Sequence, residues 1–219
     1  MRYVVDHIPR TTPKNRRPRL PMTAETITIH NTGNPTSTAR NERAWLTNPS
    51  NDRTASFHIV VDEKEAIECI PLNETAWHAG DGNGDGNRKS IGIEICESGD
   101  YERAVENAAT LVADMLIERG WGVDRLRRHW DWSGKVCPRL MHNGGSWSGW
   151  IEFKKRVEFK VMNRRFVDVP KGHWAEASIN KAAASGVMSG VTDKEFGLGQ
   201  PVTREQLAVI LDRIGALDK

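Results

Sequence analysis

The sequence predicts an α/β protein with a central mixed β-sheet flanked by helices, followed by a small α-helical module. Short alternating strand patterns and longer helical patterns follow one another up to residue 153, which is typical of a sheet covered by helices. Beyond residue 165 only two helical patterns remain. The chain of 219 residues also exceeds the roughly 150 residues of an average domain, so one medium domain and one small appendage are expected.

Composition excludes several classes of protein. With 38% hydrophobic and 27% charged residues the chain has a globular composition, and its net charge of +2 gives no electrostatic reason to expect nucleic acid. No apolar run approaches the roughly 18 to 20 residues of a membrane span, and residues 1–19 lack the apolar stretch of a secretory signal. We therefore expect a protein that is made in the cytoplasm and does not insert into a membrane.

The first strand is predicted over residues 26–30. It follows a basic, proline-containing segment at 10–21 that we expect to be a surface loop. Two isoleucines share one face of the strand, whereas the other face carries His30 and two threonines, as in a half-buried strand. A short surface helix is predicted over 36–47.

Three further strands are predicted. Residues 57–62 and 65–71 are rich in β-branched and apolar side chains and predict a hairpin. Residues 79–90 are rich in glycine, asparagine and aspartate and predict a loop, which leads into a strand at 91–96. In that strand the isoleucines face one way and Glu94 faces the other.

The remaining patterns are helical. Residues 101–119 carry apolar side chains at helical spacing and are followed by Gly120, a typical helix stop. The basic stretch 154–165 indicates the end of another helix followed by a linker. Two short helices are predicted at 174–185 and 203–214, and the second opens with the threonine and glutamine of a capping box.

Side chains that bind metals or transfer protons occur in three segments. His30 ends a strand, Glu94 lies within another, and His129 and Cys137 stand eight residues apart around a turn. Two imidazoles and a thiolate form a three-ligand zinc set that leaves the fourth position for water or substrate. The net +1 charge of such a site acidifies a water; Glu94 would take its proton, and Lys135 would face a developing oxyanion. These parts fit amide hydrolysis.

Each of these features also has a simpler interpretation. A single histidine at a strand end is usually packed, and a buried cysteine usually acts as a small apolar residue, which is our interpretation of Cys69 and Cys96. The acidic loop at 81–86 matches half of a calcium site, but Gly92 stands where the bidentate glutamate belongs. Four tryptophans either stack on sugars or fill the core: Trp130, Trp132, Trp147 and Trp150.

Five separated motifs occur in one order between residues 20 and 157: TITIHNTG, SFHIVVD, AWHAG, IGIEI and HWDWSGKVCPR. Together they resemble the type 2 N-acetylmuramoyl-L-alanine amidases, in particular the phage and prophage endolysins of Gram-positive bacilli. The resemblance implies an enzyme with one Zn²⁺ ion that hydrolyses the amide between the lactyl group of N-acetylmuramic acid and L-alanine in peptidoglycan, which lyses the cell.

The family pattern also implies a role for individual residues. His30, His129 and Cys137 would bind the zinc ion, and Glu94 and Lys135 would form the catalytic pair. A substrate groove would be lined by four residues: Asn31, Phe57, Trp77 and His78. Some relatives carry a tyrosine at the position of Phe57, where its hydroxyl meets the water on the metal. Phenylalanine cannot do this, so more of the proton transfer is expected to fall on Glu94.

The C-terminal part contains, in order, FVDVP, GHWA, GVMSG and VTRE. These segments resemble a single S-layer homology repeat, which implies attachment to secondary cell-wall polysaccharide. Arg204 would bind an acidic sugar through its planar guanidinium, and Trp174 is a second candidate for wall binding. Because such repeats usually come in threes, a lone copy would trimerise, lean on the amidase domain, or serve only as a structural appendage.

These resemblances divide the chain into a zinc amidase domain at 1–157, a linker at 158–165 and a wall-binding module at 166–219. Two other functions stay open: a non-catalytic peptidoglycan-binding protein of the same fold, and an amidase of muropeptide recycling. Cys137 argues against the first, because purely binding relatives commonly lack the third ligand, and the wall-binding module argues against the second. The expected partners are peptidoglycan, secondary cell-wall polysaccharide and further copies of the chain. The protein would be made in the bacterial cytoplasm and act on the wall after release.

Overall fold

The structure is a computed structural model that describes residues 1–163, 166–170, 172–192 and 194–217. Its contacts divide the chain into two compact units, Met1–Val157 and Glu158–Lys219. In the part of the chain that the structure describes, no helix has both the length and the apolar composition needed to cross a bilayer.

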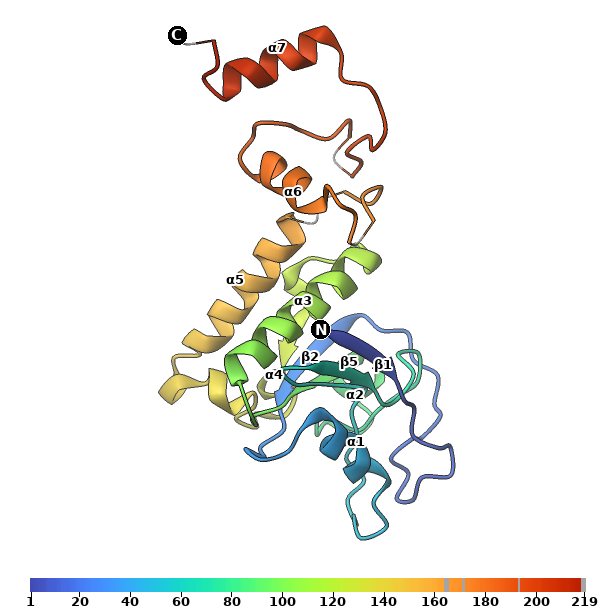
Figure 1. Cartoon of the computed structure of the whole chain (residues 1–219). Helices are drawn as coiled ribbons and strands as arrows, with labels where there is room; N and C mark the ends of the chain where they lie inside the picture. The colour runs from blue at the N-terminus through green and yellow to red at the C-terminus, as the bar shows by residue number, and fades with distance from the viewer. Residues whose placement is uncertain (164–165, 171, 193, 218–219) are drawn as a thin grey trace. The chain divides into compact units, whose positions relative to one another are not determined.

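The first unit is built on a six-stranded mixed sheet (Figure 1). Its strands are β1 (Arg2–Val5), β2 (Thr26–Asn31), β3 (Ile59–Val61), β4 (Glu65–Glu68), β5 (Ser90–Ile95) and β6 (Leu126–Arg128). They lie in the order β1-β4-β3-β5-β2-β6, and β3 with β4 is the antiparallel pair among otherwise parallel neighbours. The mixed sheet and the predicted hairpin are therefore confirmed.

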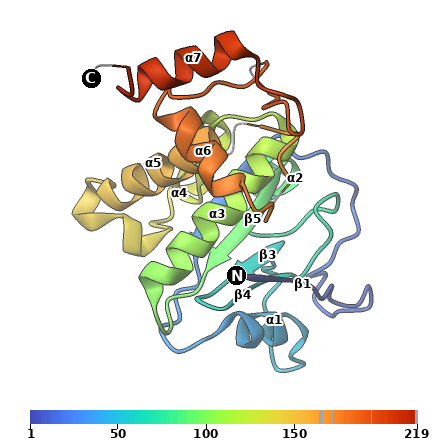
Figure 2. The same cartoon turned by 45° about the horizontal axis from the view of Figure 1, so that its top comes forward.

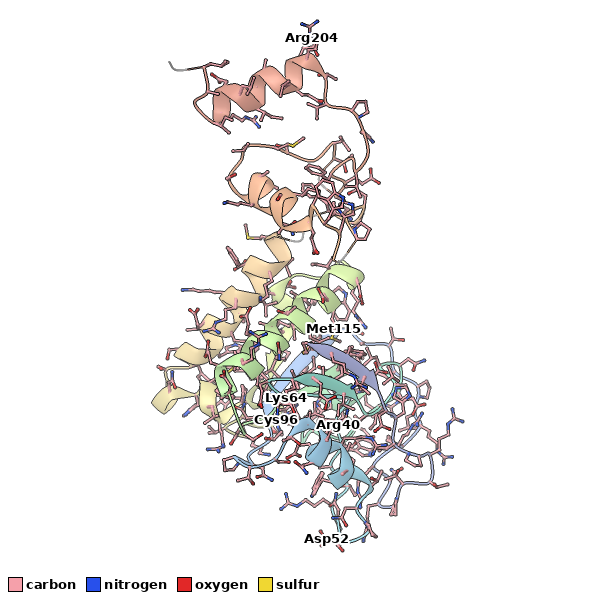
Figure 3. The ribbon with its side chains drawn as sticks, viewed as in Figure 1. Arg40, Asp52, Lys64, Cys96, Met115 and Arg204 are labelled. Atoms are coloured by element: carbon pink, nitrogen blue, oxygen red, sulfur yellow. The ribbon has the colours of Figure 1, made fainter. Side chains whose placement is uncertain are left out.

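Helices flank this sheet. They are α1 (Ala39–Thr47), α2 (Asp85–Arg88), α3 (Tyr101–Arg119), α4 (Trp130–Ser133) and α5 (Ser148–Asn163), with 3-10 turns at Val123–Arg125, Arg139–Met141 and Asn143–Gly145. Figure 2 places α1 and α3 on opposite sides of the sheet, and Figure 3 places Arg40 of α1 and Met115 of α3 accordingly. Residues 158–163, expected to belong to a linker, continue α5.

The longest helix, α3, begins and ends where its sequence indicates. The side chain of Asp100 accepts a hydrogen bond from the backbone N–H of Arg103, and Gly120 ends the helix in the left-handed conformation with φ of 64°. The apolar side chains spaced along the helix are buried: Val105, Ala108, Val112, Met115 and Leu116. The predicted helix is therefore confirmed at both ends.

Both faces of the central strands are buried, which corrects the expectation of a half-buried strand at 26–30. Every residue of β2 is buried. By strand alternation and register, the isoleucines of β2 and β5 share one face of the sheet, whereas Thr28 and His30 share the other with Glu94 and Cys96. There α1 packs with a cluster that includes Cys69 and Cys96, both fully buried, as expected of small apolar residues. The second face is polar because it carries a site, not because it meets solvent.

The basic segment before β2 is not simply a surface loop. Arg16 is fully buried, and its guanidinium donates to the carbonyl oxygens of Leu46 (2.6 Å), Arg53 (2.9 Å) and Asn51. Among the residues that the structure describes, this charged group is thus bound by three backbone carbonyl oxygens and by no carboxylate. The segment therefore fixes the turn that follows α1.

The second unit holds two short helices, α6 (Glu176–Ala184) and α7 (Arg204–Arg213). The side chains of Thr203 and Gln206 form the predicted capping box at the start of α7. The carboxylate of Asp168 accepts hydrogen bonds from the backbone N–H groups of residues 196, 197 and 198, so its role in this unit is structural. No side chain of α7 is buried, in keeping with the small core expected here.

Candidate metal centre and groove

Two histidines and a cysteine, far apart in the sequence, meet at the carboxyl ends of β2 and β6. His30 lies near the end of β2, and His129 directly follows β6, which pairs with β2 in parallel. Cys137 enters from the loop after α4. All three side chains are buried, and their candidate ligand atoms lie within 4.8 Å of one another. The structure thus brings the three predicted ligands together.

The ring nitrogens that face one another identify the candidate ligand atoms. The Nδ1 atoms of His30 and His129 are 3.1 Å apart, and the Cys137 Sγ lies 3.7 Å from the His30 Nδ1. A tetrahedral zinc ion with bonds of about 2.0 to 2.3 Å separates its ligand atoms by roughly 3.3 to 3.8 Å. The donor set therefore fits a zinc ion in chemistry; of the two separations, 3.7 Å lies within this range and 3.1 Å slightly below it.

Burial sets the protonation of these groups. It lowers the pKa of His129 to about 4 and that of His30 well below its usual value, so both rings are neutral at pH 7 and can act as ligands. Burial, together with the neighbouring Glu94, raises the pKa of Cys137 to about 12. The thiol therefore keeps its proton until a metal ion displaces it.

Glu94 stands directly beside this set. It is opposite His30 in the register of β5 and β2, and its Oε1 lies 3.9 Å from the His30 Nδ1. Its Oε2 is buried and has no hydrogen-bond partner among the described residues. Burial and the negative charge of Glu42 raise the pKa of Glu94 to about 8. A carboxyl group thus lies beside the candidate metal position, and its second oxygen is unpartnered among the described residues.

A groove of about 1320 Å³ opens from this position along α1. The predicted residues Asn31, Phe57, Trp77, His78 and Lys135 all line it. Lys135 is exposed in the loop before Cys137, so its ammonium can turn toward a bound substrate.

The side chains of the other predicted groove residues differ in how they pack and hydrogen bond within the protein. Phe57 also belongs to the apolar cluster under α1 and is 5% exposed. The indole of Trp77 donates to the carbonyl oxygen of Asn15 at 2.9 Å. The amide of Asn31 contacts the Tyr101 hydroxyl and accepts from the backbone N–H of Leu140, so it supports the loop after Cys137.

Sequence patterns did not indicate several residues of the groove. Glu42 and Trp45 line it from α1, and Arg53 lines it from the following turn. The segment 36–47 was expected to be a surface helix, and nothing in its spacing marked Glu42, which is only 9% exposed. His58 was visible within the SFHIVVD motif; it is fully buried below the site and hydrogen bonds to backbone groups.

The two candidate wall-binding residues are exposed in the second unit. Trp174 is 90% exposed, and its ring lies near that of His173. Arg204 is the first residue of α7 and lies at the end of that helix (Figure 3). Neither side chain is packed in a core, which leaves both available to a ligand.

Solved structures share the fold of the first unit. The catalytic domain of XlyA is 41% identical with a TM-score of 0.66, and the alignment covers 72% of this chain and 99% of that one. PlyL gives 36% identity and a TM-score of 0.64 over 72% of this chain and 98% of that one.

Fold and site thus define a protein of the type 2 amidase class. The profile of the N-acetylmuramoyl-L-alanine amidase family matches residues 20–140, and the chain belongs to this family. The profile of the S-layer homology domain matches residues 165–208.

Curated relatives extend this comparison. The N-acetylmuramoyl-L-alanine amidase CwlA of Bacillus subtilis (strain 168) is 50% identical over 146 residues, which are 64% of this chain and 52% of CwlA. The amidase XlyB of the same strain is 53% identical over 131 residues, 58% of this chain and 40% of XlyB. The chain therefore spans about half the length of these relatives, and the similarity falls mainly in the first unit.

Proposed function

We propose that the protein is a zinc-dependent N-acetylmuramoyl-L-alanine amidase that hydrolyses the amide between the lactyl group of N-acetylmuramic acid and L-alanine in peptidoglycan, and so lyses cells. The observation that carries the proposal is the buried set of His30, His129 and Cys137 beside Glu94 at the end of a groove. Membership of the amidase family supports the choice of bond.

One zinc ion would be held by the two Nδ1 atoms and the Cys137 thiolate. When bound, zinc supplies Lewis-acid chemistry: it acidifies a water and polarises a carbonyl oxygen. Two neutral imidazoles and one thiolate leave a net charge of +1 at the site, which favours the ionised form of Glu94. The carboxylate is then ready to act as a base.

The residues of the chain divide the proton transfer and charge stabilisation between them. Glu94 takes a proton from the attacking water as the new carbon–oxygen bond forms, then gives it to the alanine nitrogen as the carbon–nitrogen bond breaks. Lys135, exposed at the groove, stabilises the negative charge that develops on the carbonyl oxygen. Phe57 offers no hydroxyl for this chemistry, so more of the proton transfer falls on Glu94.

The groove would hold the glycopeptide. Trp77 and Trp45 offer aromatic faces along it, and Asn31 and His78 lie at its metal end. Asn31 and His78 keep most of their polar atoms engaged within the protein, so they shape this end of the groove.

The proposal is tested by zinc content and by the appearance of free L-alanine amino termini from purified cell walls. Glu94→Gln should keep the zinc ion and lose at least about a hundredfold in rate, the scale of a lost general base. Cys137→Ser should lose both zinc and activity. Glu118→Gln, an exposed carboxylate on α3, is the matched control. Unchanged rates in the first two variants would overturn the site assignment, and wall binding without cleavage by the wild type would favour the receptor alternative.

For the second unit we propose attachment to secondary cell-wall polysaccharide through Arg204 and Trp174, with a homo-oligomer formed through α7. The match to the S-layer homology domain supports the attachment. Exposed apolar side chains on and near α7 support the oligomer, because association would cover them: Leu207, Val209 and Ile214. Pull-down on purified walls with Arg204→Gln and the mass of the full chain in solution test the two parts.

A further inference from the structure

We propose that His78 is a positioning residue that fixes the ring tautomer of His30, so that the His30 Nδ1 is always free to bind the metal ion. The inference rests on the proposed zinc function and assigns His78 a role through a ligand rather than through the substrate. This role follows from a series of two hydrogen bonds that starts at a backbone carbonyl oxygen and ends at the His30 ring.

The series begins at Ser90 in β5. The carbonyl oxygen of Ser90 lies 3.0 Å from the His78 Nε2, and the His78 Nδ1 lies 3.1 Å from the His30 Nε2. The opposite nitrogen of His30, Nδ1, faces His129 and Cys137. Each ring nitrogen of His30 therefore has a separate task.

The direction of each hydrogen bond follows from the anchor. A carbonyl oxygen only accepts, so the His78 Nε2 carries a hydrogen and donates it. In a neutral ring the His78 Nδ1 is then an acceptor, and the His30 Nε2 must donate to it. The hydrogen of His30 is thus held on Nε2, and the lone pair of its Nδ1 points at the metal position.

The ring of His78 is itself held rigidly. The side-chain oxygen of Asn87 accepts hydrogen bonds from the backbone N–H groups of His78 (2.7 Å) and Ala79 (2.8 Å). Gly92 leaves the space that the His78 ring occupies, because a Cβ at this position would lie 2.5 Å from the His78 Cγ. The glycine of the IGIEI motif therefore makes room for the histidine of the AWHAG motif.

His58 shows that burial of a histidine here does not by itself create this link. It is fully buried and its ring centroid lies 5.6 Å from that of His78. Its Nδ1 accepts from the backbone N–H of Gly92, and its Nε2 donates to the carbonyl oxygen of Glu74. Within the described residues, the two ring nitrogens of His58 thus bond only to backbone groups, which makes His58 a matched control.

Two substitutions separate hydrogen bonding from packing. His78→Phe keeps a ring over Gly92 but removes the acceptor for the His30 Nε2–H. His78→Asn loses ring packing but keeps an acceptor oxygen near the position of Nδ1. A purely structural role predicts that the asparagine variant is the worse one, whereas the proposed role predicts the reverse.

The experiment uses the full-length protein with ¹⁵N-labelled histidine. Ring ¹⁵N–¹H correlation spectra of the metal-free protein report the His30 tautomer, and competition with a chelator reports zinc affinity. We expect wild type and His78→Asn to keep the hydrogen on Nε2, with zinc affinities within a few fold, and His78→Phe to mix tautomers and bind zinc about tenfold to a hundredfold more weakly. His58→Phe should lower thermal stability and leave the His30 tautomer unchanged.

Two results would overturn the inference: a His78→Phe variant with wild-type tautomer and affinity, or a His78→Asn variant as impaired as His78→Phe. A wild-type protein that binds no zinc would instead overturn the proposed function. In that case the spectra of the metal-free proteins still decide the role of His78.

Discussion

The three candidate ligands differ in whether they must lose a proton before they bind a metal ion. The rings of His30 and His129 are already neutral at pH 7, because burial lowers the pKa of both. Cys137 must lose a proton, since burial raises the pKa of its thiol to about 12. Glu94, with a pKa of about 8 in the metal-free site, must also ionise beside the arriving cation. Metal binding and proton release are therefore coupled at this site.

This coupling predicts the number of protons that zinc displaces. At pH 7 the wild type should release close to two protons per zinc ion, one from Cys137 and most of one from Glu94. Zinc affinity should therefore rise with pH, because protons compete with the metal ion. Glu94→Gln should release about one proton fewer. Calorimetry in buffers of different ionisation enthalpy measures the numbers, and equal release by both proteins would contradict the prediction.

At the residue scale, the sequence indicated which side chains are candidates for metal binding and proton transfer, but not that they meet in space. Alternation placed His30 and Glu94 on strand faces opposite the isoleucines, and the structure puts both on one side of the sheet. Nothing in spacing alone could bring His129 and Cys137 beside them, because that proximity depends on the parallel pairing of β2 with β6. The support of His30 by His78 was equally hidden, since it runs through a backbone carbonyl.

At the scale of elements, Arg16 joins the N-terminal segment to the end of α1. Its guanidinium satisfies carbonyl oxygens at and just beyond the C-terminus of this helix, where the helix dipole favours a cation. The turn that it holds forms one edge of the groove. The order of this edge thus depends on a side chain outside the groove.

Arg16→Met should destabilise the protein strongly. The methionine fills part of the space but leaves two buried carbonyl oxygens and one part-buried carbonyl oxygen without this donor, at a cost of about 2 to 4 kcal/mol in free energy of unfolding. Urea denaturation measures the loss. Arg10→Met, at an exposed position of the same segment, is the control and should change stability by less than about 0.5 kcal/mol. A small effect of Arg16→Met would show that water replaces the guanidinium.

A further prediction at the scale of elements concerns the contact between β5 and the loop that carries His78. Gly92→Ala should cost about 1 to 3 kcal/mol in free energy of unfolding, because its methyl group overlaps the His78 ring. In a His78→Ala background the same substitution should cost much less, since the ring is absent. Denaturation of the four proteins of this cycle gives the coupling energy, and additive effects would contradict the contact.

Which elements the sequence predicted depends on their length and pattern. The 19-residue α3 has an apolar stripe and both caps in its sequence, and it was predicted at both ends. The strands β1 and β6 were missed although β3 and β4 are equally short, because β3 and β4 lie in longer apolar stretches whereas β6 is largely basic and β1 is an isolated four-residue segment. The half-buried interpretation of β2 was wrong because polar residues there face a site and α1 instead of solvent.

At the scale of the whole molecule, the division into two units predicts separable activities. A chain ending at residue 163, where α5 ends, should keep zinc binding and cleave soluble muropeptides at a rate within about twofold of the full chain, because the candidate site lies wholly in the first unit. Its binding to purified walls should fall by at least tenfold if the second unit attaches the enzyme. Equal wall binding by both chains, measured by pull-down, would contradict the role of the second unit.

The alignment of β2 with β5 has a consequence for how the sheet avoids errors. A shift of two residues between them would leave each isoleucine on its own face, so the apolar surface removed from water would be nearly the same. Such a shift in either direction would separate His30 from Glu94, and the shift that moves Thr28 away from Ser90 would also break the 2.6 Å hydrogen bond between their hydroxyl groups. Hydrophobic burial therefore does not distinguish the correct register from a shifted one, whereas these polar contacts stabilise only the correct register. A misaligned molecule would be compact yet inert, so metal uptake is a stricter measure of correct folding than compactness.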